Sequence, residues 1–392
     1  MRAGNRLEKA KLAIVTEIIP PYRIPVFNLL AKHLGDNLLV LFMSAQGGRE
    51  WTIPFSRLHF SYKVMNGVRV TGRTYDPFPR YWNPEVVGNL KDFRPTMTVL
   101  AGYHHPTSYA VWWYAKRQRS KLYLHCESTL FDKRSQRAWV EGLKWVFIRT
   151  CDGYIVPGKA STEYLKSYGV DEQLIFVAPN SIDTDSFPGT TLADGGLLEC
   201  ERQRFTQDRG LPAFNLLFVG RLAPGKGADV VIDIVKRLQN DGLNVGLILV
   251  GDGPLRGQLE AVVQRENIRY TAFLGFRQPA EIASYYRMSE LLIHPSESET
   301  WGLVVNEAMT CGVPVLCSPN VGAAQDLVIE DQTGFTCSSL NDYTTRIVEL
   351  MANPDRLADM RRRCREVAAR FSPEACTEGF LRALARASEI RQ

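Results

Sequence analysis

ETWGLVVNE, residues 299–307, joins an expected strand to an expected helix and decides the fold of the second half of the chain. The apolar run SELLIHP before it has the length and composition of a buried strand. The residues that follow have helical character, and Gly312 and Pro314 are placed to end that helix. A buried strand that leads through a polar loop into a helix is the repeating unit of a parallel α/β sheet.

Two glutamates, Glu299 and Glu307, are the most informative side chains of this stretch. Glu299 is expected in the loop and Glu307 more than one turn inside the helix. Ligands of an open α/β sheet bind outside the carboxyl ends of its strands, where such loops and helix N-termini gather. Carboxylates above free N–H groups suit a ligand with hydroxyls and phosphate, such as a sugar nucleotide. Two glutamates at this spacing also occur on solvated helix faces, so the wider sequence has to decide.

The rest of the chain predicts an α/β fold with two doubly wound, Rossmann-like domains. Its 392 residues are long for one core, and short apolar runs alternate with amphipathic stretches on both sides of a turn-rich segment. The apolar runs include KLAIVTEI, TMTVLAG and KLYLH in the first half, and NLLFVG, VGLILVG and GVPVLCS in the second. We expect an N-terminal domain over 1–185, a C-terminal domain over 186–371 facing it across a cleft, and a final helix over 372–392 that crosses back to the first domain. Residues 45–85 break the alternation and are expected to form an irregular insertion.

Charge is distributed unevenly between the two halves. Residues 1–150 carry 23 Lys and Arg against 10 Asp and Glu, a balance of +13, and residues 151–392 carry 24 against 32, a balance of −8. Basic surfaces attract anionic membranes, nucleic acid or phosphorylated substrates. The basic residues are scattered, so we expect peripheral contact with an anionic membrane and no nucleic-acid partner. Eight cysteines without metal-ligand spacing, no secretory signal and no membrane span favour a cytoplasmic protein that rests at most on the inner face of a membrane.

Two glycine-rich loops follow expected strands of the second domain. GRLAPGKG, Gly220–Gly227, is nearly a phosphate-binding P-loop, but a glycine stands where a hydroxyl would bind magnesium. Arg221 and Lys226 are therefore expected to bind a diphosphate directly, with no metal and no other cofactor. GDGPLRG, with Gly251 and Gly253, is a weak dinucleotide fingerprint and a reasonable turn for close approach to a nucleotide base.

The first domain offers polar side chains at expected strand ends. His125 ends the run KLYLH and is followed by Glu127, while Tyr103 and His105 follow the preceding strand. A histidine at a strand end more often satisfies core groups than it catalyses, so both roles stay open for His125. Asp183-Thr184-Asp185 resembles an acid pair that binds metal, but no histidine or third carboxylate is near, and we interpret it as turn chemistry.

With these motifs in place, nearly the whole chain resembles the family-4 retaining glycosyltransferases of the GT-B fold. The resemblance rests on VGRLAPGKG, LVGDGPLR, FLG and HPSESETWGLVVNEAMTCGVPVLCSPNVGAAQDL in family order, on the junction segment PNSIDTDSF, and on the opening EIIPPYRIPVFNLLAKHL. It implies transfer of a sugar from a nucleotide-diphosphate donor to a glycan, a lipid-linked acceptor or a small molecule, with retention of configuration and without a metal.

The resemblance also implies roles for particular residues. Glu299 would contact donor-sugar hydroxyls, and Glu307 would hold the ribose. Arg221 and Lys226 would clamp the diphosphate, and the N–H groups of Trp301, Gly302 and Leu303 would complete the phosphate cradle. Glu299, His125 and Glu127 are the catalytic residues that the resemblance implies, with His125 and Glu127 standing where the family has its histidine and acid. Arg23, Tyr103 and His105 would lie on the acceptor side.

Three departures from the family pattern stand out. The Gly-Gly loop after the first strand is missing in PPYRIPVF, where Arg23 is the replacement we expect. The histidine and its acid are written His125-Cys126-Glu127, and the second-domain double glycine is reduced to Gly322. A sugar-nucleotide epimerase and a non-catalytic binding protein remain alternatives. Acceptor recognition is expected in loops 45–85 and 102–110, whose aromatic residues are Trp51, Phe55, Tyr81, Trp82 and Tyr103.

Overall fold

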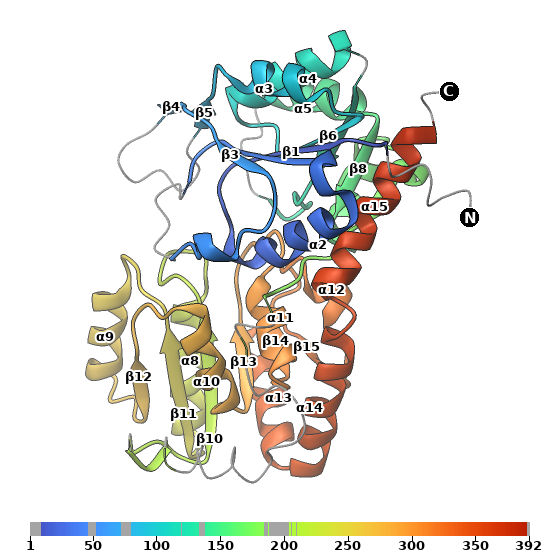
Figure 1. Ribbon diagram of the computed structural model, residues 1–392. Coiled ribbons are helices and arrows are strands. Elements are labelled where there is room, and N and C mark those ends of the chain that lie inside the picture. The colour runs from blue at the N-terminus through green and yellow to red at the C-terminus, as the bar shows by residue number, and fades with distance from the viewer. Residues whose placement is uncertain are drawn as a thin grey trace. The chain divides into compact units, whose positions relative to one another are not determined.

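The computed structural model describes residues 9–45, 52–71, 80–118, 120–132, 138–183, 187, 204, 206–208 and 210–389. The chain divides into two compact units, Met1–Asp183 with Ser372–Gln392 (unit 1) and Thr184–Phe371 (unit 2). Each unit contains a parallel sheet covered by helices, which confirms the expected pair of Rossmann-like α/β domains (Figure 1).

The sheet of unit 1 has seven parallel strands in the order β3-β2-β1-β6-β7-β8-β9. The strands are β1 (Leu12–Thr16), β2 (Leu38–Phe42), β3 (Tyr62–Val64), β6 (Met97–Ala101), β7 (Lys121–His125), β8 (Gly153–Val156) and β9 (Ile175–Val177). Leu12 of β1 pairs with Leu38 on one side and with Met97 on the other. The central strands are buried on both faces, as their continuous apolar runs require.

Helices cover both faces of this sheet. They are α2 (Ile24–Leu34), α3 (Val86–Phe93), α4 (Pro106–Gln118), α5 (Ala138–Arg149), α6 (Lys159–Ser167) and α15 (Pro373–Glu389). Phe27 of α2 and Phe380 of α15 belong to the core on one face, whereas Leu90 of α3, Val111 of α4 and Leu165 of α6 belong to the core on the other. The last helix therefore packs beside α2 within unit 1 (Figure 1).

The segment over residues 45–85 is more regular than we expected. β3 adds a parallel edge strand beside β2, and β4 (Val68–Thr71) pairs antiparallel with β5 (Arg80–Trp82). The expected irregular insertion is thus corrected. The sequence signal for β3 was weak because Tyr62 and Lys63 are both exposed on the sheet edge. The segment therefore lacks the alternation of buried and exposed side chains that marks a strand.

The sheet of unit 2 has six parallel strands in the order β12-β11-β10-β13-β14-β15. They are β10 (Phe214–Val219), β11 (Val245–Val250), β12 (Thr271–Phe273), β13 (Leu291–His294), β14 (Val315–Cys317) and β15 (Gly334–Thr336). Its helices are α8 (Ala228–Asn240), α9 (Arg256–Arg265), α10 (Pro279–Arg287), α11 (Leu303–Thr310), α12 (Ala324–Leu327), α13 (Leu340–Met351) and α14 (Pro354–Ala368).

Strand order identifies where each sheet can bind a ligand. The order reverses between β1 and β6 in unit 1 and between β10 and β13 in unit 2. In doubly wound sheets the crevice at this reversal, outside the carboxyl ends of the strands, is the usual ligand site. The loops that follow β10 and β13 carry GRLAPGKG and ETWGL, so the motifs of unit 2 meet at this reversal.

Cysteines fill the cores of both units, as expected. The seven within the described residues are buried and free, and Cys200 lies outside them. Burial raises the pKa of Cys126 and of Cys376 to about 12, so these thiols are protonated and inert near neutral pH. Among the described residues, no helix combines the length and the apolar character needed to cross a bilayer.

Candidate functional site

Hydrogen bonds join the two loops that follow β10 and β13, at the point where the strand order of the second sheet reverses. The backbone N–H of Glu297 donates to the carbonyl of Gly225 at 2.9 Å, and the Ser296 hydroxyl donates to the same oxygen at 3.2 Å. Gly227 has φ 83°, and a Cβ there would lie 2.6 Å from the carbonyl oxygen of Pro295. A glycine is therefore required where a P-loop would carry its metal-binding hydroxyl, because any side chain would push the loops apart.

An ion pair joins two of the predicted site residues across these loops. Lys226 Nζ lies 2.5 Å from Glu299 Oε2, with side chains about one-third and one-quarter exposed. Arg221 is exposed and follows Gly220 at the end of β10. Lys226 and Glu299 neutralise each other at the strand reversal. A ligand that carries both phosphate and hydroxyls can separate them, because the cation then binds the phosphate and the carboxylate binds the hydroxyls.

The backbone of Glu299 is fixed from the opposite side by the loop after β14. Its N–H donates to the carbonyl of Asn320 at 3.1 Å, and its carbonyl accepts from the N–H of Gly322 at 3.0 Å. A Cβ on Gly322 would lie 2.0 Å from the carbonyl oxygen of Thr300. This contact explains why one of the family's two glycines is retained here, because the two loops pair like adjacent strands.

The N-terminus of α11 lies directly after Glu299. Gly302 precedes the helix with φ 97° and accepts a hydrogen bond from the Val305 N–H at 3.0 Å, whereas the N–H groups of Gly302 and Leu303 come too early in the helix to have an intrahelical acceptor. Trp301 is buried, donates from its indole N–H to Asn306 at 2.7 Å, and packs on Phe371. Its side chain is thus an internal anchor, whereas the backbone of Gly302 and Leu303 presents the positive end of the helix dipole.

Glu307 projects from α11 and is held by a second helix. The hydroxyl of Tyr286, a fully buried residue of α10, donates to Glu307 Oε2 at 2.7 Å. Burial raises the pKa of Glu307, and the Tyr286 hydrogen bond offsets part of this rise. Burial and the nearby carboxylate raise the pKa of Tyr286 well above its usual value, so it remains a donor.

His294, which sequence reasoning overlooked, also lies beside Glu299. It ends β13, is 4% exposed, and neither ring nitrogen has a hydrogen-bond partner among the described residues. A Cβ on Gly302 would lie 3.6 Å from His294 Nε2 and 3.4 Å from Glu299 Cγ, so ring and carboxylate arm are neighbours. Burial lowers its pKa to about 4; Glu299 opposes this shift and Lys226 adds to it. A histidine at a strand's carboxyl end was the available signal.

Gly251 and Gly253 have a structural reason of their own. A Cβ on Gly251 would lie 1.9 Å from the carbonyl oxygen of Gly220, and one on Gly253 would lie 2.4 Å from that of Leu222. The N–H of Leu222 donates to the backbone carbonyl of Asp252 at 2.9 Å. These glycines let the loops after β10 and β11 pack against each other, and their contact with a nucleotide base stays a prediction.

Arg23 organises the carboxyl edge of the first sheet. Its guanidinium forms an ion pair with Glu127, donates to Asn180 Oδ1 at 3.1 Å, and lies 3.4 Å from His125 Nε2. Burial lowers the pKa of Arg23, but the Glu127 carboxylate, with smaller contributions from Tyr22 and Cys376, more than offsets this effect, so the pKa of Arg23 is raised. Burial and the Arg23 charge lower the pKa of His125 well below its ordinary value, so this imidazole is neutral.

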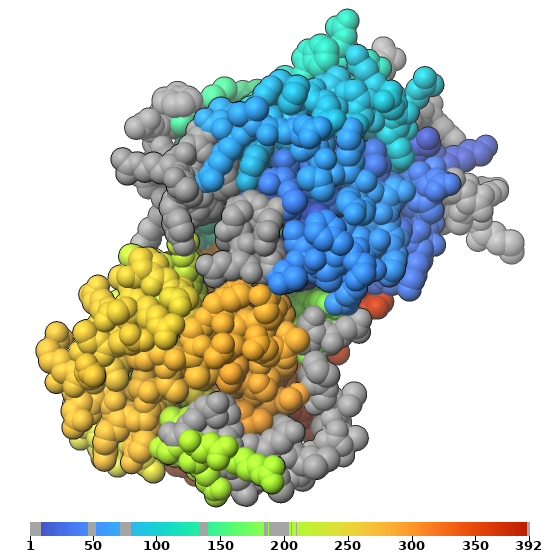
Figure 2. Space-filling view, turned by 60° about the vertical axis from the view of Figure 1, so that its left-hand side comes forward, coloured from blue at the N-terminus to red at the C-terminus, as the bar shows by residue number. Residues whose placement is uncertain are grey.

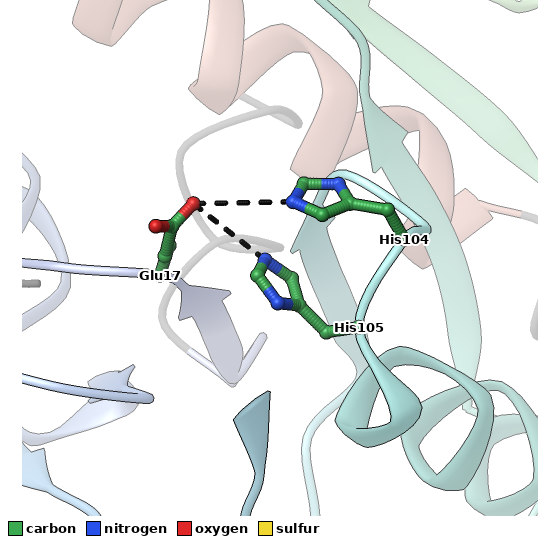
Figure 3. Close-up of side chains that lie close together, drawn as sticks. All are labelled: Glu17, His104 and His105. Carbon is green, nitrogen blue, oxygen red and sulfur yellow. Dashed lines mark ion pairs between the residues drawn. The ribbon is translucent and has the colours of Figure 1, made fainter. Parts of the chain in front are cut away.

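Glu17, His104 and His105 form a second cluster at that edge (Figure 3). Glu17 Oε2 lies 3.6 Å from His105 Nε2 and 4.0 Å from His104 Nε2. The Tyr81 N–H donates to His105 Nδ1 at 3.3 Å, which places the His105 proton on Nε2. A metal would need the lone pair of that nitrogen and a donor N–H at Nδ1. The three side chains therefore do not offer a matched set of metal ligands, and His105 Nε2 has no hydrogen-bond partner among the described residues.

The remaining first-domain predictions have mixed outcomes. Tyr103 is half-buried, its hydroxyl lies 2.9 Å from that of Tyr164, and burial raises its pKa to about 12. Phe55 and Trp82 are exposed, Tyr81 is buried, and Trp51 lies outside the described residues.

The turn interpretation of Asp183 is corrected, because its carboxylate forms a bidentate ion pair with the Arg57 guanidinium at 2.6 and 3.0 Å. Asp185 is outside the described residues.

Two doubly wound α/β units, with a basic loop and a carboxylate at the strand reversal of the second, define the GT-B class of glycosyltransferases. Residues 201–371 match the family described as glycosyl transferases group 1, and residues 51–186 match glycosyltransferase family 4. The chain belongs to the family-4 glycosyltransferases.

Individual relatives agree with this membership. The chain is 33% identical to an uncharacterized glycosyltransferase of Methanocaldococcus jannaschii over 42% of this chain and 45% of that protein. It is 30% identical to the D-inositol 3-phosphate glycosyltransferase of Gordonia bronchialis over 58% of this chain and 51% of that one. The chain thus spans about half the length of these relatives.

Solved structures share the fold at low sequence identity. Anabaena HepE in complex with UDP has a TM-score of 0.75 and 20% identity, covering 96% of this chain and 100% of that one. Sucrose-phosphate synthase of Thermosynechococcus elongatus has a TM-score of 0.69 and 19% identity, covering 94% and 97%.

Proposed function

We propose that the protein is a retaining glycosyltransferase that moves a sugar from a nucleotide-diphosphate sugar to an acceptor held by unit 1. The observation that carries this proposal is the Lys226–Glu299 ion pair at the strand reversal of unit 2. It places a phosphate-binding cation and a hydroxyl-binding carboxylate side by side, next to a helix N-terminus. Family membership and the UDP bound to HepE support the same donor class.

In this proposal the donor separates the ion pair. Lys226 and Arg221 bind the diphosphate, the N–H groups of Gly302 and Leu303 complete the cradle, and Glu299 binds sugar hydroxyls. Glu307, oriented by Tyr286, binds the ribose hydroxyls. Each group of unit 2 is then satisfied by a complementary part of one ligand, which is how a preorganised site lowers a barrier through charge and position.

Retention follows from attack on the face that the phosphate leaves. The bond between the anomeric carbon and the phosphate oxygen breaks, the acceptor oxygen bonds to that carbon on the same face, and the acceptor proton passes to the departing phosphate oxygen. No protein nucleophile is required. His125, neutral beside Arg23, and Glu127 in its ion pair are then groups that shape the acceptor side.

Catalysis without a metal is a part of this proposal that can be checked separately. Lys226 and Arg221 supply the positive charge that magnesium gives in P-loop enzymes, and Gly227 has no hydroxyl to hold one. We expect that an excess of EDTA leaves the rate of nucleotide-sugar turnover unchanged. A loss of activity that added Mg²⁺ or Mn²⁺ restores would contradict this part.

The Glu307–Tyr286 pair predicts how nucleotide affinity depends on pH. Ribose binding needs the Glu307 carboxylate, so affinity falls as the pH drops through its raised pKa. In Tyr286→Phe the lowering hydrogen bond is lost, the pKa rises further, and the fall begins at higher pH. Calorimetric titration of nucleoside diphosphate across a pH series measures both curves. Superimposable curves for the two proteins would refute this role.

The acceptor belongs to unit 1 in this proposal. Arg23, Tyr103 and His105 line its carboxyl edge, and a glycan or lipid-linked acceptor fits a cytoplasmic protein in peripheral contact with an anionic membrane. Two kinds of acceptor should be screened. One is the lipid-linked saccharide, and the other is a phosphorylated polyol, because the relative from Gordonia bronchialis is named for inositol 3-phosphate.

The test of the function begins without an acceptor. Thermal unfolding is measured with UDP, GDP and ADP, and the protein is then incubated with labelled sugar nucleotides of the stabilising base. We expect slow hydrolysis that releases the sugar with its anomeric configuration retained. Isomerised sugar nucleotide would indicate an epimerase, and binding without turnover would indicate a binding protein. Either result would overturn the proposal.

A further inference from the structure

Large apolar side chains are exposed together on two helices of unit 1. They are Tyr109 and Trp113 of α4, 45% and 50% exposed, and Leu143, Trp145 and Val146 of α5, 52%, 51% and 48% exposed. We refer to these five residues as the aromatic face. Single exposed apolar residues are ordinary on a soluble protein, but a group of them on neighbouring helices marks an interaction surface.

The two helices lie side by side. The ring of Tyr109 meets that of Phe147 edge-on at 5.7 Å, and the indole N–H of Trp112 donates to the Thr150 hydroxyl at 2.9 Å. Tyr109 and Trp113 are one turn apart, so they stand on one stripe of α4. Segments coloured cyan to turquoise, which include α3 and α4, form the upper end of unit 1 in Figure 2.

Cations accompany the aromatic rings. Arg117 lies over the ring of Trp113 at 5.7 Å, and Arg149 lies over that of Trp145 at 5.6 Å. Lys116 continues the stripe of α4, although Asp152 offsets part of its charge at 3.8 Å. Lys144 of α5 is paired with Glu141 at 2.6 Å. The two guanidinium groups therefore supply most of the positive charge beside the rings, within a half of the chain that carries a balance of +13.

We propose that the aromatic face is the surface with which unit 1 rests on an anionic lipid bilayer. Tryptophan and tyrosine rings prefer the boundary between headgroups and acyl chains, and arginine beside them binds lipid phosphate while its stem stays in the apolar layer. A second copy of the chain is a poorer occupant. A two-fold dimer through this face would set Arg117 and Arg149 against an equally basic surface.

The aromatic face also adjoins the expected acceptor side. The Phe147 ring contacts both Tyr109 and, at 5.8 Å, Tyr103. The helix α4 begins directly after His105. A bilayer under the aromatic face would thus present its headgroups next to Tyr103, whereas the His105 side chain is fully buried beneath this surface. This step rests on the proposed function and favours a lipid-linked acceptor, whereas bilayer binding itself does not depend on any enzymatic activity.

Vesicle sedimentation tests the surface directly. The full chain is mixed with vesicles of phosphatidylcholine alone, or of phosphatidylcholine with phosphatidylglycerol, and the bound fraction is measured. We expect binding to the anionic vesicles that weakens with salt, and a drop in apparent affinity of at least about tenfold for Trp113→Ser with Trp145→Ser. Arg117→Gln with Arg149→Gln should lose the preference for anionic vesicles. Tyr270→Ser, which removes an exposed aromatic ring of unit 2 that also has an arginine (Arg269) over it at 5.5 Å, is the matched control and should bind like the wild type.

Three results would overturn the proposal. They are no binding by the wild type, equal binding by the Trp113→Ser, Trp145→Ser protein, and a wild-type dimer that this double variant converts to a monomer. All substituted side chains are exposed, and unchanged thermal unfolding verifies that each variant is folded. Nucleotide affinity should be the same in every variant, so loss of vesicle binding is separable from failure of the proposed donor site.

Discussion

Replacing Glu299 with glutamine lowers the turnover of the nucleotide sugar by about a hundredfold or more, because the carboxylate that holds the donor sugar loses its charge. Affinity for the nucleoside diphosphate alone stays equal or increases, since Lys226 no longer has to leave the ion pair seen in the structure. Steady-state hydrolysis rates and calorimetric titration of the diphosphate measure the two quantities separately. A loss of nucleotide affinity with normal turnover would contradict the role of Glu299.

A second ion pair of unit 2 supplies the control for this experiment. Lys236 Nζ lies 2.8 Å from Glu266 Oε2, and its side chains are about as exposed as those of Lys226 and Glu299. Glu266→Gln removes a paired carboxylate away from the strand reversal. Turnover should change by no more than about twofold, as is usual for surface substitutions.

Replacing Lys226 with alanine weakens nucleoside diphosphate binding by about ten- to a hundredfold, because a charge-assisted hydrogen bond to phosphate contributes about 1.5–3 kcal/mol. The effect should shrink at high salt. Lys226→Arg keeps the charge and should recover part of the affinity, while Lys236→Ala should bind like the wild type. Calorimetry with the stabilising nucleotide measures all four proteins. Equal affinity of Lys226→Ala and Lys236→Ala would remove Lys226 from the site.

Much of this site could be predicted because the topology of a parallel sheet determines where its loops lie. Glycine-rich and polar loops after apolar runs converge when the strands are parallel, so Lys226 and Glu299 were expected at one edge although they are 73 residues apart. Glu307 was expected inside a helix, and α11 places it there. Local pattern was sufficient for these residues, since each lies next to a strand or helix that the sequence marks clearly.

Other features depend on contacts that no local pattern encodes. His294 is notable because tertiary packing buries its ring, and neither ring nitrogen has a hydrogen-bond partner among the described residues. Arg23 was expected on the acceptor side in place of the missing glycine loop, but its contacts could not be predicted, because Glu127, His125 and Asn180 reach it from two later strands. The contact of Glu17 with His105 likewise arises from neighbouring strands, β1 and β6, that lie far apart in the sequence. Such partners become visible only when the strand order is known.

The central claim is that unit 2 binds a nucleoside diphosphate, and that the bound diphosphate separates Lys226 from Glu299. A crystal structure of the full chain with the nucleoside diphosphate that most raises its melting temperature tests it most directly. We predict that Lys226 Nζ contacts a phosphate oxygen and no longer contacts Glu299, with the phosphates at the N-terminus of α11. A nucleotide bound elsewhere, with the ion pair intact, would contradict the account.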